Sequence, residues 1–325
     1  MNKLYPLKFK PIILEKIWGG KKLRTILNKD THSDRAGESW EISGVHGNIS
    51  VVSEGFLKGN NLQELLEIYM GDLVGDRIFE KFGYEFPLLV KFIDAGDKLS
   101  IQVHPDDILA SSRHGSFGKT EMWYVIQADK DAEITIGFNR EVTREEYLYH
   151  LNGKTLEKIL NIEKAVEGDV FFLPSGRLHA VGAGILLAEI QQTSDITYRV
   201  YDYDRPDDQG ILRELHTDIA LDAIDFSYHD NYRTVYQKKS DERTDLISCN
   251  YFRTGLYEIS KPVELDYLGK DSFVIIICIN GKIKLDYQGG TTVLSGGETI
   301  LVPAAIKDLY LTPVLRSRFL EVYIP

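Results

Sequence analysis

The stretch GDVFFLPSGRLH, from Gly168 to His179, carries the pattern that decides the fold. It reads as a turn glycine, an acidic residue, an alternating strand and a proline that ends the strand. The same order returns in GETILVPAAIKD, from Gly297 to Asp308, where the proline again follows the glycine by six residues. We therefore expect two copies of one β-domain, and only the first copy keeps the histidine.

Short strand-like runs separated by Gly, Pro, Asn and Asp fill most of the remaining chain. Many short strands with turn signals between them are typical of a sandwich or barrel rather than of a doubly wound parallel sheet. The helical pattern is confined to residues 61–70, 72–82, 155–161 and 217–224, and to a segment that begins at Thr143 with Glu146 in a capping box. The sequence predicts a mainly β chain with a small helical portion.

A charged segment divides the chain. Residues 237–245, QKKSDERTD, are nearly free of apolar side chains and are followed by almost pure strand pattern. We therefore expect a larger domain over residues 1–240 and a smaller one over residues 246–325.

Composition excludes several classes of protein. The chain has 325 residues and a formal net charge of −11, which gives no global attraction for nucleic acid or anionic lipid. The longest apolar run, residues 273–279, is too short to span a membrane, and the N-terminus lacks the apolar core of a signal peptide. Cys249 and Cys278 are too few for a disulfide framework. These features predict a cytoplasmic protein with reduced thiols.

The segment KLSIQVHP, Lys98–Pro105, predicts a strand with one apolar and one polar face. Successive side chains of a strand alternate between faces, so Ser100, Gln102 and His104 share the polar side. Taken alone, such a row is more often a solvated sheet face than the wall of a site.

Two further pieces favour a site. In KTEMWYVI, Lys119 and Glu121 fall on one face of a second strand, although a single such glutamate is more often a surface carboxylate. His179 comes just after Pro174 and Gly176, and a single histidine after a strand is usually surface-exposed or hydrogen-bonded. The spacing of Gly168, Pro174, Gly176 and His179 resembles the second motif of the cupins, in which this histidine and a carboxylate complete a metal site inside a small β-barrel.

The resulting candidate ligands are Gln102, His104, Glu121 and His179. The glutamine replaces a usual cupin histidine, and Ala183 stands where cupins commonly have an asparagine. Two imidazoles, one carboxylate and one neutral carbonyl suit a divalent ion such as zinc with an open coordination position. An Fe(II) oxygenase also uses two histidines and a carboxylate, so ligand type alone leaves that alternative open.

Polar residues around this set point to an anionic ligand. Ser100, Lys119 and Arg199 are residue types that bind phosphate, and arginine offers a planar pair of donors to an oxyanion. Glu189, on the strand-like run LLAEIQQ, is either a general base or an ordinary strand carboxylate.

Three long runs resemble one enzyme family. They are FPLLVKFIDAGDKLSIQVHPDD from Phe86, GKTEMWYV from Gly118 and PSGRLHAVGAGILLAEIQQTSDITYRVYDYDR from Pro174, and they are supported by WGG at Trp18 and GESWEIS at Gly37. They closely resemble the type I mannose-6-phosphate isomerases in their short bacterial form, and the resemblance covers essentially the whole chain.

That resemblance implies two jelly-roll, cupin-type β-barrels and one zinc ion per chain, bound by Gln102, His104, Glu121 and His179. It places the family's catalytic arginine on Arg199 and its substrate-contacting serine and lysine on Ser100 and Lys119; Glu189 is the candidate base.

The implied reaction is the interconversion of mannose 6-phosphate and fructose 6-phosphate by proton transfer through a cis-enediol. A metal-dependent dioxygenase and a non-catalytic sugar-binding cupin are the alternatives. The expected partner is a small hexose phosphate, not nucleic acid or membrane, and we expect a monomer or weak homodimer. Because Ala304, Ala305 and Asp308 replace Ser175, Gly176 and His179, the C-terminal domain is expected to bind no metal.

Overall fold

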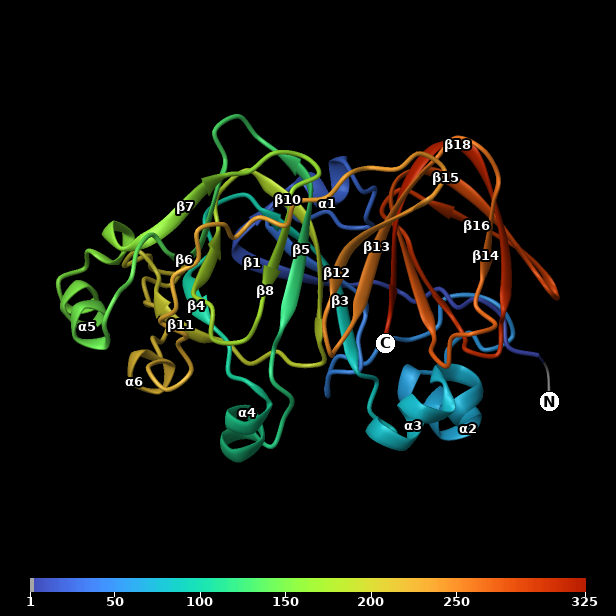
Figure 1. The fold of residues 1–325 in the computed structure, drawn as a ribbon, viewed down its shortest axis with the longest axis horizontal. Helices are drawn as coiled ribbons and strands as arrows, with labels where there is room; N and C mark the ends of the chain where they lie inside the picture. Colours follow the sequence, from blue (N-terminus) through green and yellow to red (C-terminus); the bar gives the residue numbers. More distant parts are fainter. Residues whose placement is uncertain (1–2) are drawn as a thin grey trace.

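The computed structural model describes residues 3–325 and consists mainly of antiparallel sheets that form two units side by side (Figure 1). The N-terminal unit contains a six-stranded sheet in the order β1-β2-β3-β10-β5-β8 and a five-stranded sheet in the order β11-β4-β9-β6-β7. The C-terminal unit is one seven-stranded sheet built on β12-β13-β18-β15-β16. The mainly β, cupin-type class is confirmed. The predicted closed barrels are not formed, because the strand pairs recorded for residues 3–325 end at the edges of each sheet.

The strands have the following bounds: β1 Ile12–Gly20, β2 Ala36–Ile42, β3 Leu88–Ala95, β4 Ile101–Val103, β5 Glu121–Ala128, β6 Glu133–Phe138, β7 Leu160–Lys164, β8 Val170–Leu173, β9 His179–Val181, β10 Ile185–Gln192, β11 Tyr198–Tyr201, β12 Arg243–Ser248, β13 Arg253–Ile259, β14 Val263–Asp266, β15 Val274–Tyr287, β16 Gly290–Ser295, β17 Thr299–Val302 and β18 Asp308–Tyr323. The helices are α1 Lys22–Thr25, α2 Leu62–Val74, α3 Asp76–Phe82, α4 Asp107–His114, α5 Arg144–Asn152 and α6 Thr217–Ala220, with a 3-10 turn η1 at Leu156–Lys158.

The helical predictions agree at the starts of α2 and α5. Asn61 caps α2 in a reciprocal capping box with Glu64, and Thr143 caps α5 by accepting a hydrogen bond from the backbone N–H of Glu146.

The helices α1 and α4 were not expected, although Asp106 caps α4 by accepting a hydrogen bond from the backbone N–H of Leu109. The predicted helix over residues 155–161 is wrong. A single 3-10 turn forms there, and the chain then enters β7, because pairing with β6 outweighs the weak local helical preference.

The internal repeat is present in the backbone. Gly168 and Gly297 both adopt positive φ angles, of 89° and 85°, which a glycine tolerates without strain. The acidic residues that follow these glycines make the same local contact. Asp169 and Glu298 each accept a hydrogen bond from the backbone N–H three residues earlier. The strands β8 and β17 then pair with β5 and β15 in the same register, so β5 and β15 are equivalent strands of the two copies.

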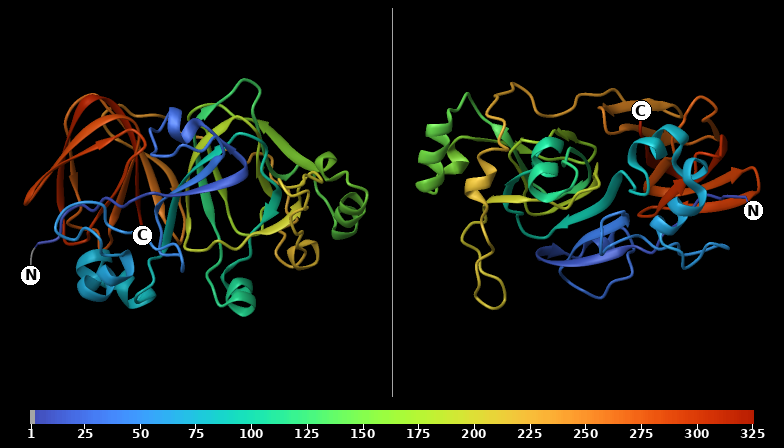
Figure 2. Two further views of the ribbon diagram at one scale, coloured as in Figure 1. Left: turned by 180° about the vertical axis from the view of Figure 1, so that it is seen from behind. Right: turned by 90° about the horizontal axis from the view of Figure 1, so that it is seen from below.

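The two units are packed through a common apolar core. One buried cluster contains Phe92 and Ile190 from the N-terminal unit together with Ile275 and Leu320 from the C-terminal unit. Leu7 also exchanges two backbone hydrogen bonds with Leu301, so the N-terminal segment adds to the sheet of the other unit. Figure 2 shows β1 and β2 lying along one side of the N-terminal unit.

The proposed division at residues 240–246 remains a prediction, and β12 begins before residue 246, at Arg243.

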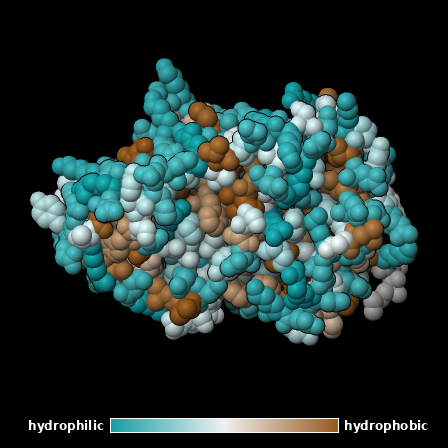
Figure 3. All heavy atoms as spheres, in the orientation of Figure 1, coloured by the Kyte–Doolittle hydropathy of each residue, from teal (hydrophilic) through white to brown (hydrophobic). Residues whose placement is uncertain are grey.

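Both cysteines are free, with Cys278 buried and Cys249 half-buried. Among the helices of residues 3–325, none has the length and apolarity that crossing a membrane requires. The face in Figure 3 is mostly hydrophilic, with hydrophobic residues in small separate groups.

Candidate metal centre and adjoining cavity

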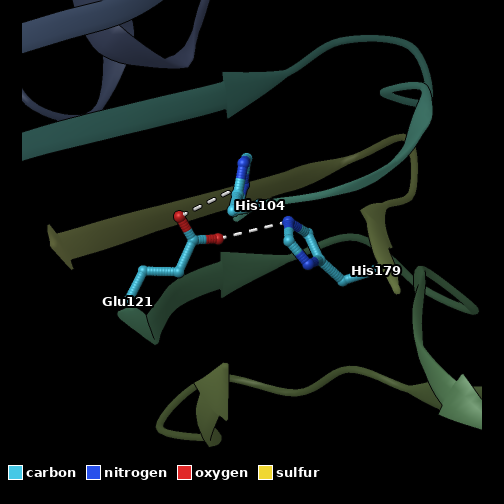
Figure 4. Close-up of side chains that lie close together, drawn as sticks. All are labelled: His104, Glu121 and His179. Atoms are coloured by element: carbon cyan, nitrogen blue, oxygen red, sulfur yellow. Dashed lines mark ion pairs between the residues drawn. The ribbon is translucent and has the colours of Figure 1, made fainter. Parts of the chain in front are cut away.

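Three predicted ligands meet between the two sheets of the N-terminal unit. His104 follows β4, Glu121 begins β5 and His179 begins β9, so side chains from both sheets converge. Glu121 lies 3.6 Å from His104 Nε2 and 3.3 Å from His179 Nε2, with one carboxylate oxygen directed at each imidazole (Figure 4). All three are buried, and their potential ligand atoms lie within 4.8 Å of one another. Such a group can hold a metal ion.

Hydrogen bonds fix both imidazoles. His104 Nδ1 lies 2.8 Å from the carbonyl oxygen of Ile196, and His179 Nδ1 lies 2.9 Å from that of Arg177. A carbonyl only accepts, so each Nδ1 carries the proton and each Nε2 presents a lone pair to Glu121. Burial, followed by the charge of Lys119, lowers the pKa of His104, and burial lowers the pKa of His179 to about 3. Both rings are therefore neutral at pH 7, as metal ligation requires.

The buried Glu121 carboxylate has one ion-pair partner but no hydrogen-bond donor. Neither of its oxygens accepts a hydrogen bond from the described residues, although Lys119 Nζ lies 3.1 Å from one of them. Burial, reinforced by the Glu189 carboxylate, raises its pKa to about 7. Lys119 therefore compensates the buried charge only in part, and a cation in the space that His104 and His179 enclose would stabilise the ionised carboxylate further.

Gln102 supplies the fourth predicted donor. It pairs directly with His179 across β4 and β9, and its side-chain amide lies 3.3 Å from His179 Nε2. Turning the amide by 180° places its oxygen at that position, which gives the carbonyl donor that the sequence predicted. The set of two imidazole nitrogens, a carboxylate and an amide oxygen fits a borderline divalent ion such as zinc.

A cavity of about 410 Å³ adjoins the metal centre. Its lining includes the four predicted site residues that are not metal ligands, namely Ser100, Lys119, Glu189 and Arg199. The candidate ligand Gln102 also lines it. Backbone register explains part of this arrangement, since Arg199 pairs with Gln102 on the neighbouring strand. The structure thus brings all eight predicted site residues to one place; their individual roles remain proposals.

Arg199 lines this cavity and keeps donors without a hydrogen-bond partner among residues 3–325. Its Nη1 donates to the carbonyl oxygen of Glu214 at 2.8 Å, whereas its Nε is buried and has no partner among residues 3–325. Burial, followed by the positive charge of Arg213, lowers its pKa, but an arginine stays protonated.

The sequence interpretation missed a chain of buried charges beside Glu189. Lys91 Nζ lies 3.3 Å from Glu189 and 3.9 Å from Glu38, and Trp123 Nε1 donates to the other Glu189 oxygen at 2.8 Å. Burial alone would raise the pKa of Glu189, but Lys91 and Lys119 reverse this, and its pKa is lowered. A lysine inside LLVKFIDA, a strand of otherwise mostly apolar residues, was the available signal, because a buried lysine needs a partner.

A larger cavity, of about 820 Å³, lies between α2, α3, α4 and the loop at Tyr251. Apart from Asp195, its lining is distinct from that of the smaller cavity, and it contains none of the four predicted ligands. The chemistry-bearing residues therefore favour the smaller cavity as the candidate site.

Comparison with known proteins agrees with this arrangement. Residues 7–146 match the family described as phosphomannose isomerase type I, catalytic domain, and residues 242–317 match mannose-6-phosphate isomerase, cupin domain. The chain is 38% identical to mannose-6-phosphate isomerase ManA of Bacillus subtilis, covering 94% of this chain and 95% of that protein. It is 36% identical to mannose-6-phosphate isomerase of Streptococcus mutans, covering 93% and 94%. The crystal structure of the mannose 6-phosphate isomerase from Bacillus subtilis superimposes with a TM-score of 0.88 at 34% identity, covering 98% of this chain and 99% of that one.

Proposed function

The chain belongs to the type I phosphomannose isomerases, and from that premise we propose that it interconverts mannose 6-phosphate and fructose 6-phosphate. The observation that carries the proposal is the buried group of His104, Glu121 and His179 directly beside a cavity whose lining carries five lysine and arginine side chains against three carboxylates. A cavity with Lys119 and Arg199 in its wall suits an anionic sugar, in a protein whose net charge would otherwise repel one.

We propose one zinc ion per chain, held by Gln102, His104, Glu121 and His179. The features that support it are the two Nε2 lone pairs and the Glu121 carboxylate, which accepts no hydrogen bond from residues 3–325. When bound, zinc supplies Lewis acidity toward a substrate oxygen without redox chemistry, which suits an isomerisation that needs no external oxidant.

The proposed chemistry is a proton transfer through a cis-enediol. A base takes the proton from C2 of the aldose and returns it to C1, while a proton moves from O2 to O1, so no atom or electron is gained. We assign the base to Glu189, which lines the cavity and whose lowered pKa keeps it ionised at pH 7. Lys91 and Trp123 hold its carboxylate in one orientation.

Arg199 is the proposed stabiliser of the developing oxyanion. It lines the cavity, and its Nη2 has no hydrogen-bond partner among residues 3–325, which leaves a donor for a substrate oxygen. Ser100 and Lys119 are the proposed substrate-binding residues. Lys119 Nζ lies 3.1 Å from both Glu121 and His104, so its contact with substrate falls at the metal end of the cavity.

The experiment that tests this function combines metal analysis with an isomerase assay. We expect about one zinc per chain, loss of mannose 6-phosphate isomerisation after chelation and recovery on adding zinc back, with the same rate under anaerobic conditions. A purified, zinc-loaded protein that does not convert mannose 6-phosphate would refute the proposal. A strict requirement for oxygen would favour the dioxygenase alternative.

A further inference from the structure

The cavity wall contains an arginine that the proposed mechanism does not use. Arg213 lines the cavity together with Arg199 and lies in the segment that connects β11 to α6. Its side chain is 22% exposed, against 5% for Lys119. Arg213 therefore lies toward the solvent side, whereas Lys119 lies at the buried metal end.

A buried carboxylate fixes the orientation of Arg213. Arg213 Nε donates to one oxygen of Asp202 at 2.6 Å, and Nη2 donates to the other oxygen. Asp202 is itself buried and is not part of the cavity lining. Burial would raise the pKa of Asp202, but the hydrogen bonds from Arg213 and Arg205 lower it, so the carboxylate is ionised. This side-on pairing leaves Arg213 Nη1 without a hydrogen-bond partner among residues 3–325.

The cavity lining carries more positive than negative side chains, with five lysines and arginines against Glu38, Glu189 and Asp195. Arg205 shares Asp202, but its other contacts, to Asp97 and to the carbonyl oxygen of Lys98, turn it away from the cavity. Arg213 and Arg199 remain as two guanidinium groups in one cavity wall, close enough for their charges to repel. An anion with several acceptor oxygens would relieve that repulsion and occupy the free donors.

The shape of the substrate decides which anion fits. In a hexose 6-phosphate the reacting carbons, C1 and C2, are at the opposite end of the chain from the phosphate. If the metal centre and Lys119 hold the C1–C2 end, the phosphate extends toward the solvent side, where Arg213 lies.

We propose that Arg213 binds the phosphate group of the sugar phosphate through its free Nη1 edge, and that Asp202 is the positioning residue that holds this edge toward the cavity. The identity of the sugar rests on the proposed function, whereas the phosphate contact rests on Arg213, Arg199 and Asp202.

A purely structural role for Arg213 is the competing explanation. The segment that connects β11 to α6 has a second anchor at Asp208, where Arg35 Nη1 donates to both carboxylate oxygens. Arg35→Met is therefore a matched control, because it removes an arginine that anchors this segment without lining the cavity. That ion pair is exposed, so its loss is expected to change binding less than twofold.

The test uses zinc-loaded full-length protein and calorimetric titration with inorganic phosphate and with mannose 6-phosphate. For Arg213→Met we expect the affinities for inorganic phosphate and for mannose 6-phosphate to fall about 10- to 100-fold, because hydrogen bonds to a charged group are lost. The zinc content should be unchanged. In the isomerase assay, KM should rise by a similar factor with kcat within about threefold of wild type, since a contact made equally in ground and transition states changes KM. Arg213→Lys should lie between wild type and Arg213→Met, because the charge remains and the paired donors to Asp202 are lost.

Asp202→Asn tests the positioning role, because it leaves every residue of the cavity wall in place. We expect a smaller rise in KM than for Arg213→Met, with normal kcat and zinc content. Wild-type phosphate binding in Arg213→Met would overturn the proposal, and so would a loss confined to kcat or a loss equalled by Arg35→Met. If wild-type protein binds both probes but does not isomerise mannose 6-phosphate, the proposed function fails alone, because the titrations still test Arg213.

Discussion

Replacing Lys91 with methionine tests the buried charge chain without reference to catalysis. The substitution keeps the length and apolar stem of the side chain but removes the charge between Glu189 and Glu38. Lys91 and Glu189 are 7% and 4% exposed and 3.3 Å apart. At an effective dielectric constant of 20, two unit charges at that distance attract by about 5 kcal/mol, and breaking a buried pair by removing one partner typically costs about 3–5 kcal/mol. We expect Lys91→Met to lower the free energy of unfolding by that amount at pH 8.

The pH dependence has a definite sign. In the wild-type protein the pKa of Glu189 is lowered, so its ionised form contributes stability that is lost as the pH falls. Without Lys91 the desolvation of Glu189 dominates, and its pKa rises above the ordinary value for a glutamate of about 4.3. A raised carboxylate pKa destabilises the protein as the pH rises, so the deficit should be smaller at pH 5 than at pH 8.

Urea unfolding of the wild-type protein, Lys91→Met and Lys91→Met/Glu189→Gln at both pH values measures this effect. The double variant should recover part of the loss, because a neutral amide is cheaper to bury than an unpaired carboxylate. Lys164→Met is the control, since its ion pair with Asp131 is exposed and should contribute less than about 1 kcal/mol. A Lys91→Met deficit below about 1 kcal/mol at pH 8, or an equal deficit at both pH values, would refute the reasoning.

Three further predictions concern the metal centre and the proposed chemistry. His179→Ala should lose stoichiometric zinc and activity while keeping its circular dichroism spectrum, and full zinc occupancy in this variant would contradict the assigned site. The full-length protein should bind one zinc and not two, so a second equivalent that survives in His179→Ala would place a metal in the C-terminal unit. Arg199→Lys should lose about 100- to 1,000-fold in kcat with zinc content intact, and a variant with normal kcat and only a raised KM would remove Arg199 from the chemical step.

The sequence predicted the candidate site better than it predicted the helices. Ser100, Gln102 and His104 could be grouped because a strand has a period of two, and their spacing survives any small error in the strand boundaries. The helix expected at residues 155–161 failed because its sequence pattern is short and the neighbouring strand β6 was free to pair. Asp202 and Arg213 could not be found by pattern alone, since their pairing depends on a loop conformation. The position of Lys91 in a mostly apolar strand was a signal in the sequence, but its partners Glu38 and Glu189 could not be read from that pattern.

The equivalence of the two β-copies explains why only one is expected to hold a metal. Glu121 pairs with Leu173, five residues after Gly168, and Val274 pairs with Val302, five residues after Gly297. Val274 therefore occupies the position of the metal-site carboxylate, while Asp308, which follows Gly297 at the same offset as His179 follows Gly168, is exposed. A buried valine donates nothing to a cation but packs against Ile276 and Val302 in the apolar core of the C-terminal unit. The same strand position is thus part of the apolar core in the C-terminal unit. In the N-terminal unit it carries the Glu121 carboxylate, and a bound cation would offset the free energy that burying this charge costs.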